Sequence, residues 1–147
     1  MAAIRRAEVN WTGALTTGSG TVSAVSSALF TELPVSWAAR TEASNGKTSP
    51  EELLAAAHAS CFAMALSGAL ARAGTPPDRL DVSAEVTFDK LDAGWRVVSS
   101  ALTVRGWVPG SSADDFRAAA ESTRDGCPIS QALKGNVALS VDATLES

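Results

Sequence analysis

The sequence predicts an α+β fold in a single domain, residues 1–147. Apolar and polar side chains alternate in several short segments, as half-buried strands require. Two other segments, Ser49 to Ala73 and Ser112 to Asp125, have the pattern of helices. A chain of this length can bury a working core, and neither a linker nor an internal repeat divides it. We therefore expect the element order β-β-β-α-β-β-α-β, with largely antiparallel pairing.

Three extended segments precede the long helix. From Ile4 to Trp11 the side chains alternate between two faces, as in a half-buried strand. The turn residues Gly18 to Gly20 come next, and Thr21 to Ser26 follows as a second strand. A third extended run is expected from Val35 to Glu42, after Pro34. Three short strands in succession predict a meander.

The long helix has clear start and stop signals. After the Asn45-Gly46 turn, Ser49 is placed as N-cap, Pro50 as the first helical residue and Glu52 to reach back to the cap. Gly74 and the following prolines end the helix. The run is nearly uncharged, but it is rich in alanine, which favours lipid only weakly. We expect this helix to be surrounded by protein and not to span a membrane.

The remaining elements alternate between strands and helices. Val82 to Phe88 and Trp95 to Val108 have strand patterns and flank the turn Asp92-Ala93-Gly94, so we expect a hairpin. Ser112 to Asp125 is predicted to be an amphipathic helix that buries Phe116, Ala119 and Ala120. Val137 to Leu145 alternates again and is expected to be the last strand.

Charge and cysteine content narrow the function classes. The net charge is −4 and the basic residues are scattered, which argues against a nucleic-acid partner. No secretory signal is recognised near the amino terminus, and two widely separated cysteines do not resemble the framework of a secreted domain. We expect a cytoplasmic protein.

Each cysteine has a structural and a chemical interpretation. Cys61 lies in the apolar helix, where a free cysteine is commonly a small core residue. His58 precedes it by three residues, so both lie on one helical face, and a hydrogen-bonding neighbour would favour the reactive thiolate. A lone histidine on a packed helix is, however, more often a core residue with satisfied hydrogen bonds. Cys127 precedes Pro128, which fits the first position of a short segment, Pro128 to Lys134. The helix dipole would then favour the Cys127 thiolate, although the same residues could simply form a turn.

Zinc binding is a further possibility that the residues leave open. His58, Cys61 and Cys127 with a nearby carboxylate could form a tetrahedral site. The ligand set is thin, because the chain has one histidine and no Cys-x-x-Cys pair. The absence of that pair also argues against a thioredoxin-like exchange motif.

Two segments resemble the OsmC/Ohr family of organic hydroperoxide peroxidases. The first is KTSPEELLAAAHASCFAMAL, from Lys47 to Leu66, and the second is GCPISQAL, from Gly126 to Leu133. The resemblance extends through nearly the whole chain. His58 before the cysteine, and the lack of an arginine in the turn from Gly18 to Gly20, favour the OsmC branch over the Ohr branch.

The resemblance implies a fold and an activity. The fold would be an intertwined homodimer in which antiparallel sheets enclose long central helices, with active sites at the subunit boundary. Cys61 would attack the peroxide and become a sulfenic acid, and Cys127 would resolve it as a disulfide. A dithiol or lipoyl-type donor would reduce that disulfide, and no cofactor or metal is implied. An apolar lining from Phe62, Met64, Leu66 and tryptophans on the strands would suit organic hydroperoxides better than hydrogen peroxide, although the same residues could simply belong to the core.

Arg40 and Glu51 match the charged pair of OsmC-type sites. In that resemblance Arg40 stabilises the Cys61 thiolate and Glu51 holds the guanidinium. From the residues alone, Glu51 is a favourable charge in the first helical turn and Arg40 a solvated strand residue. Ten helical residues separate Glu51 from Cys61 by about 15 Å and about 80° around the axis, so the two side chains cannot meet. If they share an active site, either Arg40 bridges the gap or a second chain supplies one of them, and we expect a dimer with composite sites. The alternative is a non-enzymatic dimeric module that binds zinc or a small ligand.

Overall fold

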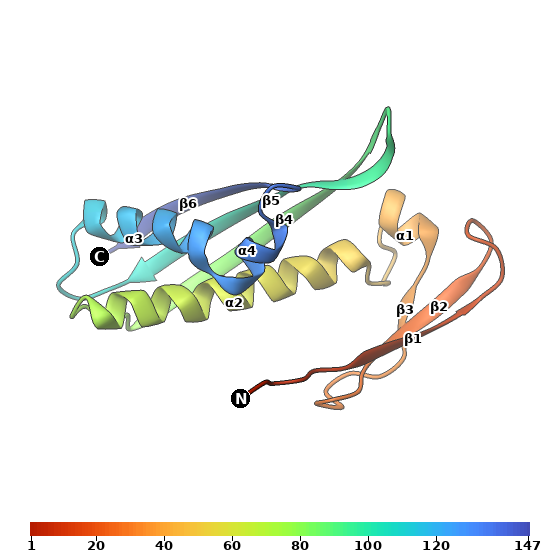
Figure 1. The fold of residues 1–147 in the computed structure, drawn as a ribbon, viewed down its shortest axis with the longest axis horizontal. Helices are drawn as coiled ribbons and strands as arrows, with labels where there is room; N and C mark the ends of the chain where they lie inside the picture. The colour runs from red at the N-terminus through yellow and green to blue at the C-terminus, as the bar shows by residue number, and fades with distance from the viewer. The chain divides into compact units, whose positions relative to one another are not determined.

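The computed structural model describes residues 1–147, which form an α+β protein as predicted (Figure 1). The element order is β-β-β-α-α-β-β-α-α-β. The chain divides into two compact units, Met1–Pro50 and Glu51–Ser147. Each unit contains one three-stranded sheet.

The first unit is the predicted meander. Its strands are β1 (Ala7–Thr12), β2 (Ser19–Ala24) and β3 (Leu33–Val35), which pair antiparallel in the order β1-β2-β3 (Figure 1, red to orange). The register places Val9 opposite Val22. The third strand is much shorter than the sequence predicts.

The expected extended run from Val35 to Glu42 is wrong beyond its first residue. Helix α1 (Trp37–Thr41) occupies this stretch, and the Ser36 hydroxyl caps it by accepting a hydrogen bond from the Ala39 backbone N–H at 3.2 Å. A side chain that satisfies an otherwise free helical N–H stabilises the helix start, and the alanines that follow favour helix over strand. Local capping therefore overrides the alternating pattern.

Helix α2 (Pro50–Arg72) begins at the predicted proline. The Asn45-Gly46 turn before it is also confirmed, since the Lys47 N–H donates to the Ser44 carbonyl at 2.9 Å. Gly74, with φ of 87°, follows the helix in the left-handed conformation that suits a C-terminal cap. By length and composition α2 could cross a membrane, and 22% of its most apolar window is buried within the chain.

The second unit contains a sheet in the order β4-β5-β6, with β4 (Arg79–Leu91), β5 (Gly94–Trp107) and β6 (Ala138–Glu146). The first two strands form the predicted antiparallel hairpin, but β6 pairs with β5 in parallel. The reason is the crossover through α3 (Ala113–Gly126) and α4 (Pro128–Leu133), because a helical connection returns the chain in the same direction. The prediction of largely antiparallel pairing is therefore confirmed, since every strand pair is antiparallel except β5 with β6.

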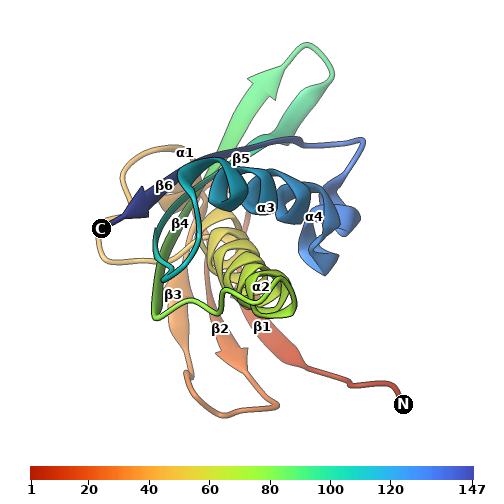
Figure 2. The same cartoon turned by 90° about the vertical axis from the view of Figure 1, so that its left-hand side faces the viewer.

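The core of the second unit lies between this sheet and its helices. α2, α3 and α4 cover one face of the sheet (Figure 2). The buried cluster is contributed by α2, β5, α3 and the residue between the last two helices: Phe62, Leu66, Leu70, Leu102, Val104, Val108, Phe116, Ala120 and Cys127. The predicted inward face of α3 is confirmed by the complete burial of Phe116 and Ala120.

Candidate active site

The two cysteines come together in the second unit. Cys127 lies between α3 and α4, where it ends the first helix and caps the second. Its sulfur accepts a hydrogen bond from the Ser130 backbone N–H at 3.4 Å, as expected for an N-cap residue, and only 1% of the residue is exposed. Cys61, half-buried on α2, packs against the core cluster that contains Cys127. Both thiols are free.

The environment of Cys61 opposes its ionisation overall. Burial raises the pKa of the Cys61 thiol, a hydrogen bond from the Ile129 backbone N–H lowers it, and the interaction with Cys127 raises it further. Two facing sulfurs cannot both carry negative charge without repulsion. Within the second unit, therefore, the surroundings of Cys61 favour the thiol over the thiolate.

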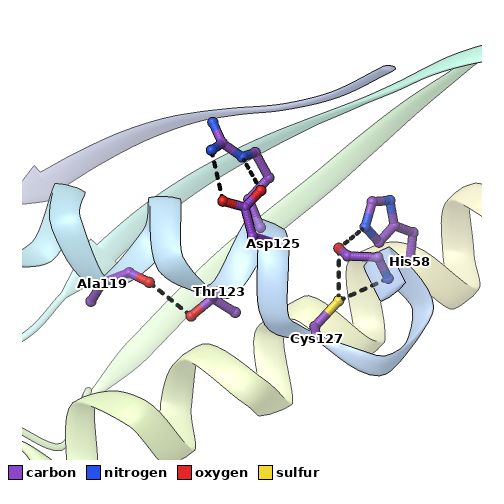
Figure 3. Close-up of polar contacts among 7 residues, drawn as sticks. His58, Ala119, Thr123, Asp125 and Cys127 are labelled. Atoms are coloured by element: carbon purple, nitrogen blue, oxygen red, sulfur yellow. Dashed lines mark hydrogen bonds and ion pairs between the residues drawn. The ribbon is translucent and has the colours of Figure 1, made fainter. Parts of the chain in front are cut away.

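His58 is completely buried and holds together two distant segments. Its Nδ1 lies 2.6 Å from the Ser100 hydroxyl of β5, and its Nε2 lies 2.8 Å from the Ser130 hydroxyl of α4. Ser130 also lies 3.0 Å from the Cys127 sulfur. The dashed lines between His58 and Cys127 in Figure 3 trace this connection. Burial lowers the pKa of His58 below its ordinary 6.5, so the ring is neutral near pH 7.

This arrangement confirms His58 as a buried core residue with satisfied hydrogen bonds, against its two chemical alternatives. Its ring nitrogens bond to Ser100 and Ser130, so neither serves Cys61 as the helical spacing suggested. A zinc ion would need one of those nitrogens, which both already have partners. No group of three or more His, Cys, Asp or Glu side chains is arranged to hold a metal ion.

Of the two interpretations of the apolar residues near Cys61, the structure favours the core over a site lining for Phe62 and Leu66. Phe62 and Leu66 are fully buried in the core, whereas Met64 is 71% exposed. The reason is the helical period, because residues one and five positions after Cys61 face the sheet that α2 covers.

Glu51 and Arg40 lie in different units. Glu51 is in the first turn of α2 and is 7% exposed. Arg40 is a half-buried residue of α1, with its guanidinium 5.9 Å from the centre of the Trp37 ring. The alternative reading of Arg40 as a solvated strand residue is therefore wrong.

Sequence reasoning missed Ser100 and Ser130. Ser130 stands within the segment Gly126 to Leu133, and its importance appears only when the fold brings it to His58. Ser100 did carry a signal. It shares the inward-facing period of β5 with Leu102 and Val104, and a polar residue on a core face needs a partner.

Comparisons with known proteins agree with this architecture. The family described as OsmC-like protein matches residues 43–142. Peroxiredoxin OsmC of Escherichia coli is 40% identical over 135 residues, which cover 92% of this chain and 93% of that protein. The organic hydroperoxide resistance protein OhrA of Bacillus subtilis is 36% identical over 101 residues, covering 67% of this chain and 66% of that protein.

A solved structure shares the fold. The crystal structure of the organic hydroperoxide resistance protein OhrB of Bacillus subtilis covers 96% of this chain and 98% of its own, with a TM-score of 0.69. The sequences are 22% identical, so this likeness concerns the fold alone.

Proposed function

This chain belongs to the OsmC family, and from that premise we propose that it is a cysteine peroxidase that detoxifies organic hydroperoxides and, more slowly, hydrogen peroxide. The observation that carries the proposal is that Cys61 packs against the buried cluster that contains Cys127, whose side chain raises the pKa of the Cys61 thiol. Relatives named for peroxide reduction and for organic hydroperoxide resistance support the substrate class. We propose a cytoplasmic location, because two widely separated cysteines do not resemble the disulfide framework of a secreted domain.

The reaction uses each sulfur once. The Cys61 thiolate attacks the terminal oxygen of the hydroperoxide, the O–O bond breaks, and the alkoxide leaves as alcohol after taking a proton. Cys61 is then a sulfenic acid. Cys127 attacks its sulfur, the S–S bond forms, and the hydroxide leaves as water. A dithiol or lipoyl-type donor restores both thiols by exchange and is itself oxidised to a disulfide.

The first step needs a positive charge, because the surroundings of Cys61 raise its pKa. We assign that charge to Arg40, whose guanidinium would stabilise both the thiolate and the departing alkoxide. Glu51 would orient the guanidinium by pairing with it. The unbroken course of α2 from Pro50 to Arg72 keeps Glu51 and Cys61 about 15 Å apart, so a shared site requires either that Arg40 bridges the gap or that a second chain supplies one of these residues.

The exposed face of α2 supports a homodimer. Ala56, Ala57, Ser60 and Met64 form one exposed stripe, and the helix has no charged residue between Glu52 and Arg72. In the first unit, Val9 and Trp11 on one face of β1 are 59% and 40% exposed. Uncharged exposed faces of this kind are typical of interfaces. We propose that a second copy of the chain covers them and that each active site is composed at the boundary.

Mass spectrometry after one equivalent of cumene hydroperoxide tests the function. The wild-type protein should form a Cys61–Cys127 disulfide and release the corresponding alcohol. Cys127→Ala should stop at a Cys61 sulfenate that dimedone traps, and Cys61→Ser should consume no peroxide. Measuring the zinc content of the same sample distinguishes the peroxidase from the alternative, a non-enzymatic module that binds zinc. Stoichiometric zinc that shields both thiols from alkylation, with no peroxide consumed, would contradict the peroxidase.

A further inference from the structure

A buried chain of polar side chains leads from the middle of the core to Cys127. It consists of Ser100, His58, Ser130 and Cys127, with successive contacts of 2.6, 2.8 and 3.0 Å. Each of the four residues is at most 1% exposed. They come from β5, α2 and the start of α4. Burying this many polar groups costs free energy that apolar side chains would not, so the chain calls for an explanation.

We propose that Ser130 and His58 form a proton relay that deprotonates Cys127 when it attacks the Cys61 sulfenic acid. Ser130 is the catalytic residue of this relay, because its hydroxyl touches the reacting sulfur. His58 acts through Ser130 as a positioning residue, and it accepts a proton temporarily and then returns it. The relay rests on the proposed function, since it serves the second step of that cycle.

The contacts are compatible with the arrangement of protons that the relay requires. With the proton on Nδ1 and directed to the Ser100 hydroxyl oxygen, His58 has a free lone pair on Nε2. Nε2 then accepts the Ser130 hydroxyl proton, and the Ser130 oxygen accepts the Cys127 S–H. In this tautomer His58 can receive a proton through Ser130.

During the reaction the protons shift along this line. As the Cys127 sulfur attacks, its proton passes to the Ser130 oxygen, and the Ser130 proton passes to Nε2 of His58. The S–S bond forms while the S–O bond of Cys61 breaks and hydroxide leaves. The proton held by His58 returns through Ser130 to that hydroxide and forms water. Ser130 and His58 are neutral again at the end of the step. The only oxidant that the step requires is the Cys61 sulfenic acid, which is consumed as the disulfide forms.

The neighbours of His58 leave it a neutral base. On the inward face of the sheet, Val86 of β4 and Leu139 of β6 flank Ser100, whereas Glu85 lies on the opposite face. On α3, Arg124 and Asp125 pair with each other at 3.0 Å (Figure 3). The titratable group linked to His58 through Ser130 is Cys127. On α2 itself, Glu51 and Glu52 lie about two turns before His58 and Cys61 one turn after it. Burial alone shifts the pKa of His58.

The test measures the two steps separately on the full chain. Sulfenate formation is followed with cumene hydroperoxide in the presence of dimedone, and disulfide formation is followed after the peroxide is consumed. Dividing the rate of disulfide formation by the rate of sulfenate formation cancels any change that affects Cys61 in both steps. In the wild-type protein this ratio should stay flat between pH 6.5 and about pH 8, because neutral His58 supplies the base throughout.

Ser130→Ala should lower the ratio by about 100-fold, within the range for a lost acid–base group. His58→Asn should lower it similarly and should make it rise about tenfold per pH unit, because free thiolate then becomes the reactant. Ser130→Thr keeps a hydroxyl and should recover most of the loss. Ser140→Ala, at an exposed position of β6, is the matched control and should match the wild-type ratio.

The possible results distinguish failure of the proposed relay from failure of the proposed peroxidase function. A wild-type ratio that itself climbs tenfold per pH unit overturns the relay without any variant, so a folding defect cannot conceal the answer. An unchanged ratio in both Ser130→Ala and His58→Asn also overturns it. Failure of the wild-type protein to form any sulfenate is a different outcome, because it removes the peroxidase and, with it, the step that the relay serves.

Discussion

Cys61 and Cys127 are 66 positions apart in the sequence, yet their thiols interact directly in the second unit. One thiol is carried by the long helix and the other by the junction of two helices that cross over the sheet. The contact has an electrostatic consequence, since the Cys127 side chain raises the pKa of Cys61.

Removing the Cys127 sulfur should therefore lower the pKa of Cys61. Cys127→Ala eliminates the charge repulsion and the hydrogen bond that favour the Cys61 thiol, while the favourable Ile129 N–H remains. The rate of iodoacetamide alkylation against pH measures the change. Ser140→Ala should leave the curve in place. An unchanged or higher Cys61 pKa in Cys127→Ala would mean that burial alone sets its value.

Arg40→Met should slow sulfenate formation by about 100-fold or more, because the guanidinium no longer stabilises charge on the thiolate and the leaving oxygen. Stopped-flow mixing with cumene hydroperoxide measures this rate. Arg117→Met is the matched control, since Arg117 is exposed on α3 and pairs only with Asp114 at 3.0 Å. Equal rates in the two variants would remove Arg40 from the active site.

The folded protein should lose stability as the pH falls below 6.5. The pKa of His58 is lower in the folded chain than its ordinary 6.5, so below that pH the unfolded chain binds a proton that the folded chain does not. The slope approaches about 1.4 kcal/mol per pH unit between the unfolded and folded pKa values. Urea unfolding at pH 7.5, 6.5 and 5.5 measures it.

His58→Asn provides the comparison for that slope. The chain has a single histidine, so this substitution removes every histidine-linked contribution at once. The variant should be less stable at pH 7.5 but should lose less stability between pH 6.5 and 5.5. Parallel curves for the variant and the wild type would assign the acid sensitivity to carboxylates instead.

Gly106→Val should destabilise the second unit by about 1–3 kcal/mol, the usual cost of overpacking. A Cβ at Gly106 of β5 would overlap the Phe116 ring of α3, which is fully buried and has no free space to move into. Chemical denaturation measures the loss. Gly126→Ala is the control, because a Cβ there meets no atom within 4 Å. A Gly106 variant as stable as the control would show that α3 can shift away from the sheet.

Met64→Glu should weaken the proposed dimer at least tenfold. The substitution places a charge in the uncharged stripe of α2, and desolvating that charge at an interface is costly. Sedimentation velocity over a range of concentrations measures the dissociation constant. Ala118→Glu, on the exposed side of α3, is the control for added charge. Equal dimer stability in both variants would place the interface elsewhere.

Much of the fold was predictable because its signals are local. Pro50 fixed the start of α2, the residues Asp92 to Gly94 fixed the hairpin, and the period around Phe116 fixed the buried face of α3. The prediction of an extended run from Val35 to Glu42 was wrong because it took no account of another local signal, the Ser36 cap. The parallel pairing of β6 could have been inferred from the helical crossover that precedes it.

The sequence by itself determined which residue types were available: two thiols in distinct settings, one histidine and the two segments that mark the family. Tertiary structure alone decided their partners. His58 appeared from its spacing to face Cys61, but the fold directs it to Ser100 and Ser130, which lie 42 and 72 residues away. Helical spacing reports only neighbours within one helix, whereas packing against a sheet and a crossover decides which buried polar atoms meet.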